Sequence, residues 1–126
     1  MNIEILSCAE RQIKAIDVMQ LYKDVGWWEE RIEQDIEEIL NNEQSVGAWK
    51  DDTLIGFARA VSDGNFRAYI EDVVIHSSYR KEGIGKLLVS KLLDELSHID
   101  VISLFCEGHL VPFYKKTILN IANHNL

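Results

Sequence analysis

The sequence predicts an α+β domain with mixed α/β layers, in which helices cover both faces of a mostly antiparallel sheet. Its 126 residues, 47% of them hydrophobic, suffice for one domain with its own core, and we expect residues 1–126 to form it. Three successive strand patterns in the middle of the chain are joined by short polar turns, which indicates a meander. Two amphipathic helix patterns precede the meander and a third follows it, which favours helices on both sides of the sheet.

The N-terminal third predicts one strand and two helices. Residues 1–7 alternate enough to form a strand, and Ser7 and Glu10 then have the spacing of a capping box that starts a helix. Apolar residues at helical spacing follow as far as Tyr22. Residues 29–42 form the second helix pattern, with isoleucines and a leucine on one face and acidic residues on the other.

The middle of the chain predicts three strands, at residues 45–50, 53–62 and 66–76. The third strand alternates at first and becomes continuously apolar at residues 73–75. This change indicates either a strand whose end is buried on both faces or a strand that contains a bulge.

The last part of the chain predicts a leucine-rich helix at residues 83–96 and a strand at 101–106. A short helix follows at 111–116, with Pro112 in its first turn. Residues 117–126 are ambiguous.

Composition excludes several classes of function. The net charge of −8 argues against nucleic acid as a partner and would attract cationic substrates such as amines, although solubility is the simpler explanation of the charge. The sequence has no long apolar run and no leader pattern, so we expect no membrane span and no signal peptide. Cys8 and Cys106 lack metal-ligand spacing and predict free thiols in a reducing cytoplasm, with no metal site.

Gly83 and Gly85 stand where the leucine-rich helix begins, although glycine is a poor helix former. A strand, a basic glycine loop and a helix start together form an anion-binding arrangement, because the first amides of a helix have no internal partners and the helix dipole adds positive charge. Arg80, Lys81 and Lys86 add further positive charge. We therefore expect a pyrophosphate ligand at this turn.

Two common phosphate motifs do not fit the glycine turn. The loop of nucleoside triphosphatases would place Arg80 at its first glycine and Leu87 at its Ser/Thr position. The dinucleotide fingerprint, begun at Gly83, would place Leu88 where glycine or alanine is required. A purely structural turn is the remaining alternative, but one glycine would suffice for it.

The segment VVIHSSYRKEGIGKLL, at residues 73–88, resembles the R/Q-x-x-G-x-G/A signature of the GCN5-related N-acetyltransferases (GNAT), which bind acetyl-coenzyme A. Arg80, Gly83 and Gly85 occupy the three signature positions. Downstream, LFCEGHLVPFY resembles the family segment that leads into an aliphatic-x-FY helix, and the order of elements also matches. The resemblance covers roughly residues 3–116 and implies a GNAT-like fold forming a single N-acetyltransferase domain.

The resemblance implies acetyl-coenzyme A as co-substrate and no metal. Backbone groups of Val73, Val74 and Ile75 would pair with the pantetheine arm, in a slot where the family splays two neighbouring strands. A backbone N–H near Val74 would polarise the thioester carbonyl. The pyrophosphate would be held by the turn residues Arg80, Lys81, Glu82, Gly83, Ile84, Gly85 and Lys86.

The resemblance also implies catalytic groups. Glu71 and Asp72 lie where the family often places a general base, acting directly or through water. Adjacent strand residues point to opposite faces, so at most one should face the slot; we favour Asp72 slightly, although a bulge would change this, and solvated or capping acids are the alternative. Tyr114 matches the tyrosine that protonates the departing thiolate, with a core tyrosine as the alternative. His109 is a weaker candidate base.

We expect the acceptor pocket to come from the first helices and their loop, with Trp27, Trp28 and Tyr22 as substrate-binding candidates and Phe57 as a further one. Aromatic rings there would pack on an alkyl or aryl amine, or hold a cation. Core packing is the simpler alternative for such large residues.

The C-terminus departs from the family pattern. After Tyr114, family members usually continue with a glycine turn and one or two closing strands, whereas this sequence offers TILNIANHNL. We expect the last strand to be missing or replaced by residues 118–121; a missing strand would leave an apolar edge that favours a homodimer. The predicted function is transfer of acetyl to a primary amine of a small molecule or protein. The alternatives are a catalytically weak acyl-coenzyme A-binding module that lost turnover with its C-terminal strands, and a structural interaction protein without a cofactor.

Overall fold

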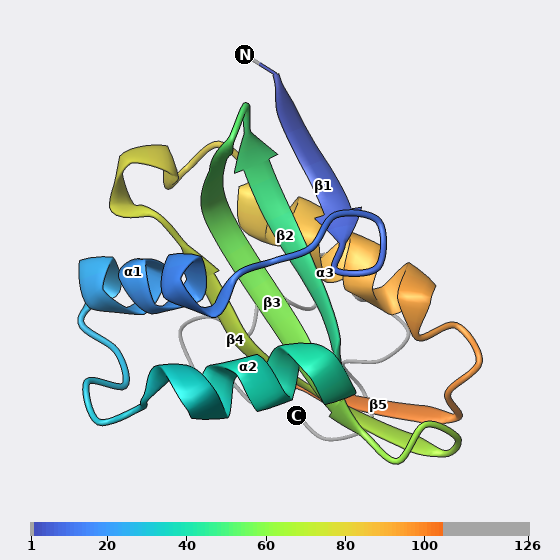
Figure 1. Ribbon diagram of the computed structural model, residues 1–126. Helices are drawn as coiled ribbons and strands as arrows, with labels where there is room; N and C mark the ends of the chain where they lie inside the picture. The colour runs from blue at the N-terminus through green and yellow to red at the C-terminus, as the bar shows by residue number, and fades with distance from the viewer. Residues whose placement is uncertain (1, 105–126) are drawn as a thin grey trace.

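Five strands lie in chain order in one sheet, in a computed structural model that describes residues 2–104 (Figure 1). Neighbouring strands are antiparallel from the first to the fourth, and the fifth is parallel to the fourth. Helices cover both faces of the sheet, as the sequence predicts. The strands are β1 (Ile3–Ser7), β2 (Gln44–Lys50), β3 (Thr53–Ser62), β4 (Arg67–Ile75) and β5 (Val101–Leu104), and the helices are α1 (Ala15–Val25), α2 (Glu33–Asn42), the 3₁₀ turn η1 (Ser77–Tyr79) and α3 (Ile84–Glu95).

Two apolar clusters hold the helices to the sheet. On the face of α1 and α2, Leu21 and Ile36 pack in one cluster with Phe57 of β3. On the opposite face, Leu88 of α3 packs with Ile55 of β3. These side chains are no more than 1–2% exposed, so β3 is the central strand of the core and β4 lies beside it. Figure 1 shows α1 and α2 in front of the sheet and α3 behind it.

The predicted start of the first helix is wrong. Ser7 and Glu10 do form the reciprocal hydrogen bonds of a capping box: the Ser7 N–H donates to Glu10 Oε1 at 2.9 Å, and the Glu10 N–H donates to Ser7 Oγ at 3.2 Å. They close a turn after β1, however, and α1 begins only at Ala15. The intervening chain buries Ile13 and is still extended at Lys14 (φ −91°, ψ 140°), which lets it cross to the α1 face. The second helix likewise begins at Glu33 rather than at residue 29.

β4 contains a β-bulge, one of the two alternatives that the sequence left open. The register with β3 shifts between Phe57 and Arg59, so that two residues of β4, Asp72 and Val73, stand opposite Ala58. Asp72 has a φ of +53°, in the left-handed region that residues other than glycine rarely adopt. The bulge therefore sets the directions of the side chains around Asp72.

Among residues 2–104, no helix has the length and apolar character to cross a membrane. The predicted short helix at 111–116, the substitute strand at 118–121 and the edge expected to form a dimer lie outside the described residues.

Candidate active site

The connection from β4 to α3 is an exposed loop that ends in a left-handed glycine. Lys81 has a φ of +72° and Gly83 a φ of +77°. Gly83 is the N-cap of α3, and a Cβ atom added there would meet nothing within 4 Å. Glycine is therefore favoured at this position by its backbone conformation, and the space beside it is open to a ligand.

The first turn of α3 presents backbone donors at this loop. Its first helical hydrogen bond runs from the Leu87 N–H to the Gly83 carbonyl, at 3.3 Å. The amides of Ile84, Gly85 and Lys86 precede it and have no partner within the helix. The turn thus brings together the residues that the sequence assigns to pyrophosphate binding, an assignment that stays a prediction.

Asp24 of α1 holds this loop in place. Its carboxylate accepts hydrogen bonds from the backbone N–H of Ser77 at 2.7 Å and from Ser77 Oγ at 3.0 Å. The backbone hydrogen bond is the main cause that lowers the pKa of Asp24. The loop between β4 and α3 is therefore tied to the helix that leads into the candidate acceptor pocket.

The end of β4 has one edge paired with β3. Gly56 stands opposite Ile75, and the His76 N–H donates to the Ile55 carbonyl at 2.8 Å. On the other edge, pairing with β5 is described only as far as Ile70, so within residues 2–104 no strand pairs with the outer edge at 73–75. The resemblance predicts that the backbone of these residues pairs with the pantetheine arm.

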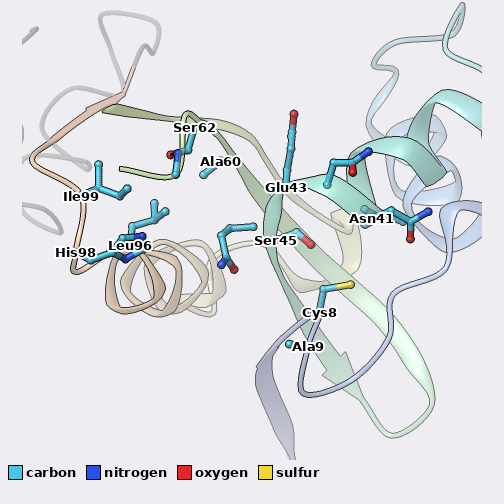
Figure 2. A pocket seen from close by; sticks show the side chains of 14 residues that line it. Cys8, Ala9, Asn41, Glu43, Ser45, Ala60, Ser62, Leu96, His98 and Ile99 are labelled. Atoms are coloured by element: carbon cyan, nitrogen blue, oxygen red, sulfur yellow. Dashed lines mark hydrogen bonds between the residues drawn. The ribbon is translucent and has the colours of Figure 1, made fainter. Parts of the chain in front are cut away.

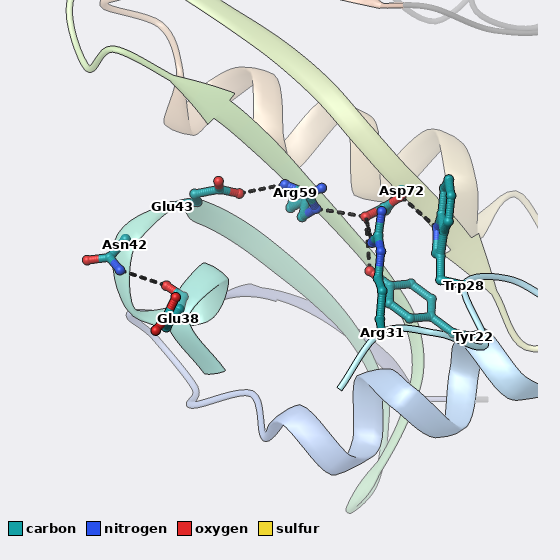
Figure 3. A network of polar contacts seen from close by, with 8 residues as sticks. All are labelled: Tyr22, Trp28, Arg31, Glu38, Asn42, Glu43, Arg59 and Asp72. Carbon is teal, nitrogen blue, oxygen red and sulfur yellow. Dashed lines mark hydrogen bonds and ion pairs between the residues drawn. The ribbon is translucent and has the colours of Figure 1, made fainter. Parts of the chain in front are cut away.

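Asp72 is the centre of a buried polar network that joins both sides of the site (Figure 3). Its side chain is 2% exposed. Its two carboxylate oxygens accept four hydrogen bonds from side chains of α1, the α1–α2 loop and β3. The donors are Tyr22 Oη (3.0 Å), Trp28 Nε1 (3.1 Å), Arg31 Nη1 (2.9 Å) and Arg59 Nε (2.7 Å).

The network also reaches the end of α2. Arg59 donates a further hydrogen bond through Nη1 to Glu43 Oε1, at 2.7 Å. Two carboxylates and two guanidinium groups thus lie together, Asp72 and Glu43 with Arg59 and Arg31. Their formal charges cancel, which makes their burial tolerable.

The network sets the protonation of its members. Burial alone would raise the pKa of Asp72, but the hydrogen bonds and charges of Arg59 and Arg31 outweigh it and hold that pKa below its ordinary value of 3.8. Burial and the neighbouring Asp72 carboxylate raise the pKa of Tyr22. At neutral pH, Asp72 is therefore ionised and engaged by donors, a poor state in which to accept a proton from a substrate.

The bulge changes the direction of Glu71 relative to Asp72. Glu71 is paired with Arg59, and Ala58 and Ala60, on either side of that arginine, belong to the cluster beneath α3. Paired residues share a face, so Glu71 lies on the α1–α2 face, where the hydrogen bonds of Asp72 also place that carboxylate. The expectation that these adjacent acids point to opposite faces of the sheet is therefore wrong, because alternation fails at the bulge. Which of them faces the thioester slot stays a prediction.

The three predicted acceptor residues line one pocket of about 500 Å³ beside the network. Tyr22 is buried, whereas Trp27 and Trp28 are 39% and 42% exposed at the α1–α2 loop. The rings of Trp28 and Tyr22 already face an internal cation, because Arg31 Cζ lies 4.0 Å from the first ring centroid and 5.6 Å from the second. The role of these residues in substrate binding stays a prediction.

Arg31 and Arg59 are site residues that the sequence reasoning missed, and both leave a signal. Arg31 is the single basic residue between Lys23 and Lys50, within an acidic stretch. Arg59 interrupts an otherwise apolar strand pattern. A lone arginine in such a setting predicts a buried acidic partner.

A second hollow, of about 510 Å³, lies at the opposite end of α3 from the glycine loop (Figure 2). Leu96 and His98, just beyond α3, line one part of it, and Cys8 and Ser45 line another. A helix of 12 residues separates it from Gly83 by roughly 18 Å. It includes neither the glycine loop nor Asp72, so it is not the candidate active site. No group of three His, Cys, Asp or Glu side chains within residues 2–104 is placed to hold a metal ion.

Comparison with known proteins gives the family. Residues 10–117 match the sequence model of the Acetyltransferase (GNAT) family. The chain belongs to the GNAT family. This confirms the predicted family and, with it, the class of acyltransferase enzymes.

Two further candidate catalytic residues, Tyr114 and His109, lie outside the described residues.

Relatives agree with this assignment. The chain is 36% identical over 120 residues to the "Uncharacterized N-acetyltransferase ycf52" of Pyropia yezoensis, covering 90% of this chain and 68% of that protein. It is 44% identical over 65 residues to the "Histone acetyltransferase TAP1" of Glycine max, covering 50% of this chain and only 28% of that protein. Among solved structures, a GNAT family acetyltransferase from Streptococcus pneumoniae aligns with a TM-score of 0.75 at 29% identity, covering 91% of this chain and 85% of the other. The GNAT fold is therefore shared along most of the chain.

Proposed function

We propose that this chain is an N-acetyltransferase that moves the acetyl group of acetyl-coenzyme A to a primary amine of a small molecule or a protein. The observation that carries the proposal is that three structural features follow one another directly along the chain. A bulged β4, a left-handed Gly83 and the amide-bearing first turn of α3 follow one another. Together they offer a strand edge for an extended arm and a set of backbone donors for a pyrophosphate.

The donor side works by positioning. The amides of residues 81–86, with Arg80 beside them, would hold the pyrophosphate, and the backbone of Val73, Val74 and Ile75 would align the pantetheine arm. The open space at Gly83 fits a phosphate close to the main chain. A backbone N–H near Val74 would stabilise the charge that develops on the thioester oxygen.

The acceptor amine must lose a proton before it attacks the thioester carbon. We propose Glu71 as the group that takes this proton, directly or through water, because it lies on the α1–α2 face beside the bulge. A C–N bond then forms and the C–S bond breaks. Tyr114 would give its proton to the departing thiolate.

The acceptor pocket supports a primary amine with an apolar or aromatic body, through Trp27, Trp28 and the buried Tyr22. The name of the Glycine max relative supports a protein amine as the other class of acceptor. A cytoplasmic location and a homodimer remain predictions.

Calorimetry with coenzyme A, followed by a thiol-release assay with acetyl-coenzyme A, tests the proposal. The acceptor panel holds spermidine, phenethylamine, glucosamine 6-phosphate and a lysine peptide. We expect binding, and thiol release that depends on one of these amines. Binding without amine-dependent release would instead support the acyl-coenzyme A-binding module, and absence of binding would overturn both readings.

The role of Tyr114 has its own test. Tyr114→Phe removes the phenolic proton donor and keeps the ring, so we expect kcat to fall by at least about tenfold while coenzyme A affinity changes less than about threefold. Tyr79→Phe, at the end of η1, is the matched control. An unchanged kcat in Tyr114→Phe would remove Tyr114 from this role.

A further inference from the structure

The Asp72 carboxylate is buried and accepts hydrogen bonds through both oxygens, so it is poorly placed to meet a substrate. Oδ2 accepts from Tyr22, Arg31 and Arg59, and Oδ1 accepts from the indole of Trp28. Because the side chain is 2% exposed, a substrate amine would have to move the groups that cover it, these donors among them, to reach the carboxylate. Displacing an arginine would leave a buried charge without its partner, which is costly.

The same carboxylate holds the α1–α2 loop in an unusual conformation. Trp28 has a φ of +53°, a left-handed conformation that costs a bulky residue about 1–2 kcal/mol. Such a conformation persists only where surrounding contacts fix it. Here the Trp28 indole N–H donates to Asp72, and Arg31, also bonded to Asp72, stacks on the Trp28 ring.

Asp72 also belongs to the strand that is proposed to carry the donor. It forms the bulge with Val73, and Val74 follows directly. One side chain therefore fixes two things at once: the pocket wall formed by Trp28 and Arg31, and the strand at which the thioester would lie. A wall that shifts away from the bound amine loses contacts that are made equally with the substrate and the transition state, so the loss should appear mainly in the KM for the amine.

Resting on the proposed acetyl transfer, we infer that Asp72 is a positioning residue that fixes the Trp28–Arg31 wall of the acceptor pocket to the β4 bulge, and is not the general base. The groups that face it are Tyr22 from α1, Trp28 and Arg31 from the α1–α2 loop and Arg59 from β3, with Glu43 at the end of α2 behind Arg59. Glu71 beside it is left to take the proton.

Asp72→Asn separates the two roles, because the amide keeps the shape and loses the charge. We expect kcat/KM for the best amine of the panel to fall by about 10- to 100-fold, mainly through KM. KM for acetyl-coenzyme A should stay within about twofold, and the acid limb of the kcat profile against pH should remain. Loss of that limb with a fall in kcat of about 100-fold or more, at an unchanged amine KM, would overturn the inference and make Asp72 the base.

Two further variants keep the test decisive if Asp72→Asn folds poorly. Arg31→Met removes one donor and leaves Arg59 on the carboxylate, so it should raise KM for the amine in the same way. An unchanged amine KM in Arg31→Met would overturn the inference. Asp52→Asn is the matched control, since its side chain is fully exposed and its ion pair with Arg11 is long, at 3.5 Å.

A readout that needs no activity tests the wall directly. The chain has three tryptophans, so fluorine NMR of protein labelled with 5-fluorotryptophan should resolve three signals, and Trp28→Phe assigns one of them. We expect the Trp28 signal to shift in Asp72→Asn and in Arg31→Met, but not in Asp52→Asn. An unmoved Trp28 signal would overturn the inference even if acetyl transfer is confirmed. Failure of wild-type protein to bind coenzyme A would count against the proposed function alone.

Discussion

The two sides of the candidate site are built in opposite ways. The donor side, at residues 80–86, is a short contiguous loop whose recognition groups are backbone amides beside an open space. The acceptor side is a buried set of side chains around Asp72 that come from positions as distant as Tyr22. A site made of backbone amides can be recognised from a short sequence motif, whereas a network of distant side chains can be recognised only from the whole fold.

The difference also separates stability from binding. Residues 80–83 and 86 of the glycine loop are exposed, whereas Ile84 and Gly85 are buried, so changes at the exposed positions should act mainly on the ligand. The Asp72 network is buried and balanced in charge, so removal of one member should act first on folding.

The largest effect is expected for Arg59→Met. Glu43 would lose its ion pair and Asp72 would keep only Arg31 as a cation, and a buried carboxylate that loses a charged partner is strongly destabilised. We expect the free energy of unfolding, measured with urea, to fall by about 3 kcal/mol. Arg67→Met changes an exposed arginine at the start of β4, in the same hairpin, and should alter this free energy by less than about 0.5 kcal/mol. Similar losses in the two variants would remove the contrast between the buried network and its surroundings.

A substitution on the donor side should weaken ligand binding more than it lowers the stability of the fold. Gly83→Ala places a Cβ in the open space and adds left-handed strain, whereas Gly83→Asn places a Cβ there with less strain. If the space belongs to a phosphate, both variants should weaken coenzyme A binding by about tenfold in calorimetry, about 1.4 kcal/mol. Asparagine should lose less stability than alanine. Binding that recovers in Gly83→Asn would mean that strain, rather than contact with the ligand, explains the glycine.

Much of the fold and of the donor side could be predicted from the sequence, because the relevant signals are local. The strand at 53–62 and the glycine turn after β4 depend on alternation, turn residues and a spacing of a few residues. The start of α1 could not, since the Ser7–Glu10 capping box is present and only the burial of Ile13 against the sheet decides that the helix begins later.

The acceptor side was harder to predict from the sequence, because it also depends on contacts between distant residues. Alternation assigns Glu71 and Asp72 to opposite faces, and only the register with β3 shows that the bulge brings both to one face. The pairing of Asp72 with Arg31 and Arg59 joins residues 41 and 13 positions apart, which no short motif records.

A smaller effect is expected for Tyr22→Phe. The variant removes one of the four donors to Asp72 and keeps the buried ring, while both arginines remain. One hydrogen bond to a charged group is worth about 1.5–3 kcal/mol, and the remaining donors should reduce the loss to about 1 kcal/mol in urea unfolding. Tyr79→Phe, which removes a hydroxyl of η1 outside this network, is the control. A loss as large as that of Arg59→Met would show that the hydroxyl, rather than the arginines, dominates the network.

The smallest effect is expected in acid, because burial opposes the two arginines in setting the pKa of Asp72. That pKa is lower in the folded protein than in the unfolded chain, so on acidification the unfolded chain binds the proton first. The contribution of Asp72 to stability is therefore complete above about pH 5 and is lost as the pH falls through 3.8 toward the folded pKa. Carboxyl carbon NMR of Asp72 should give a midpoint below 3.8, with the exposed Asp52 as the reference. A midpoint at or above 3.8 would mean that burial outweighs the arginines; Asp72 would then become a plausible proton acceptor, and the contrast between a positioning network and a catalytic base would fail.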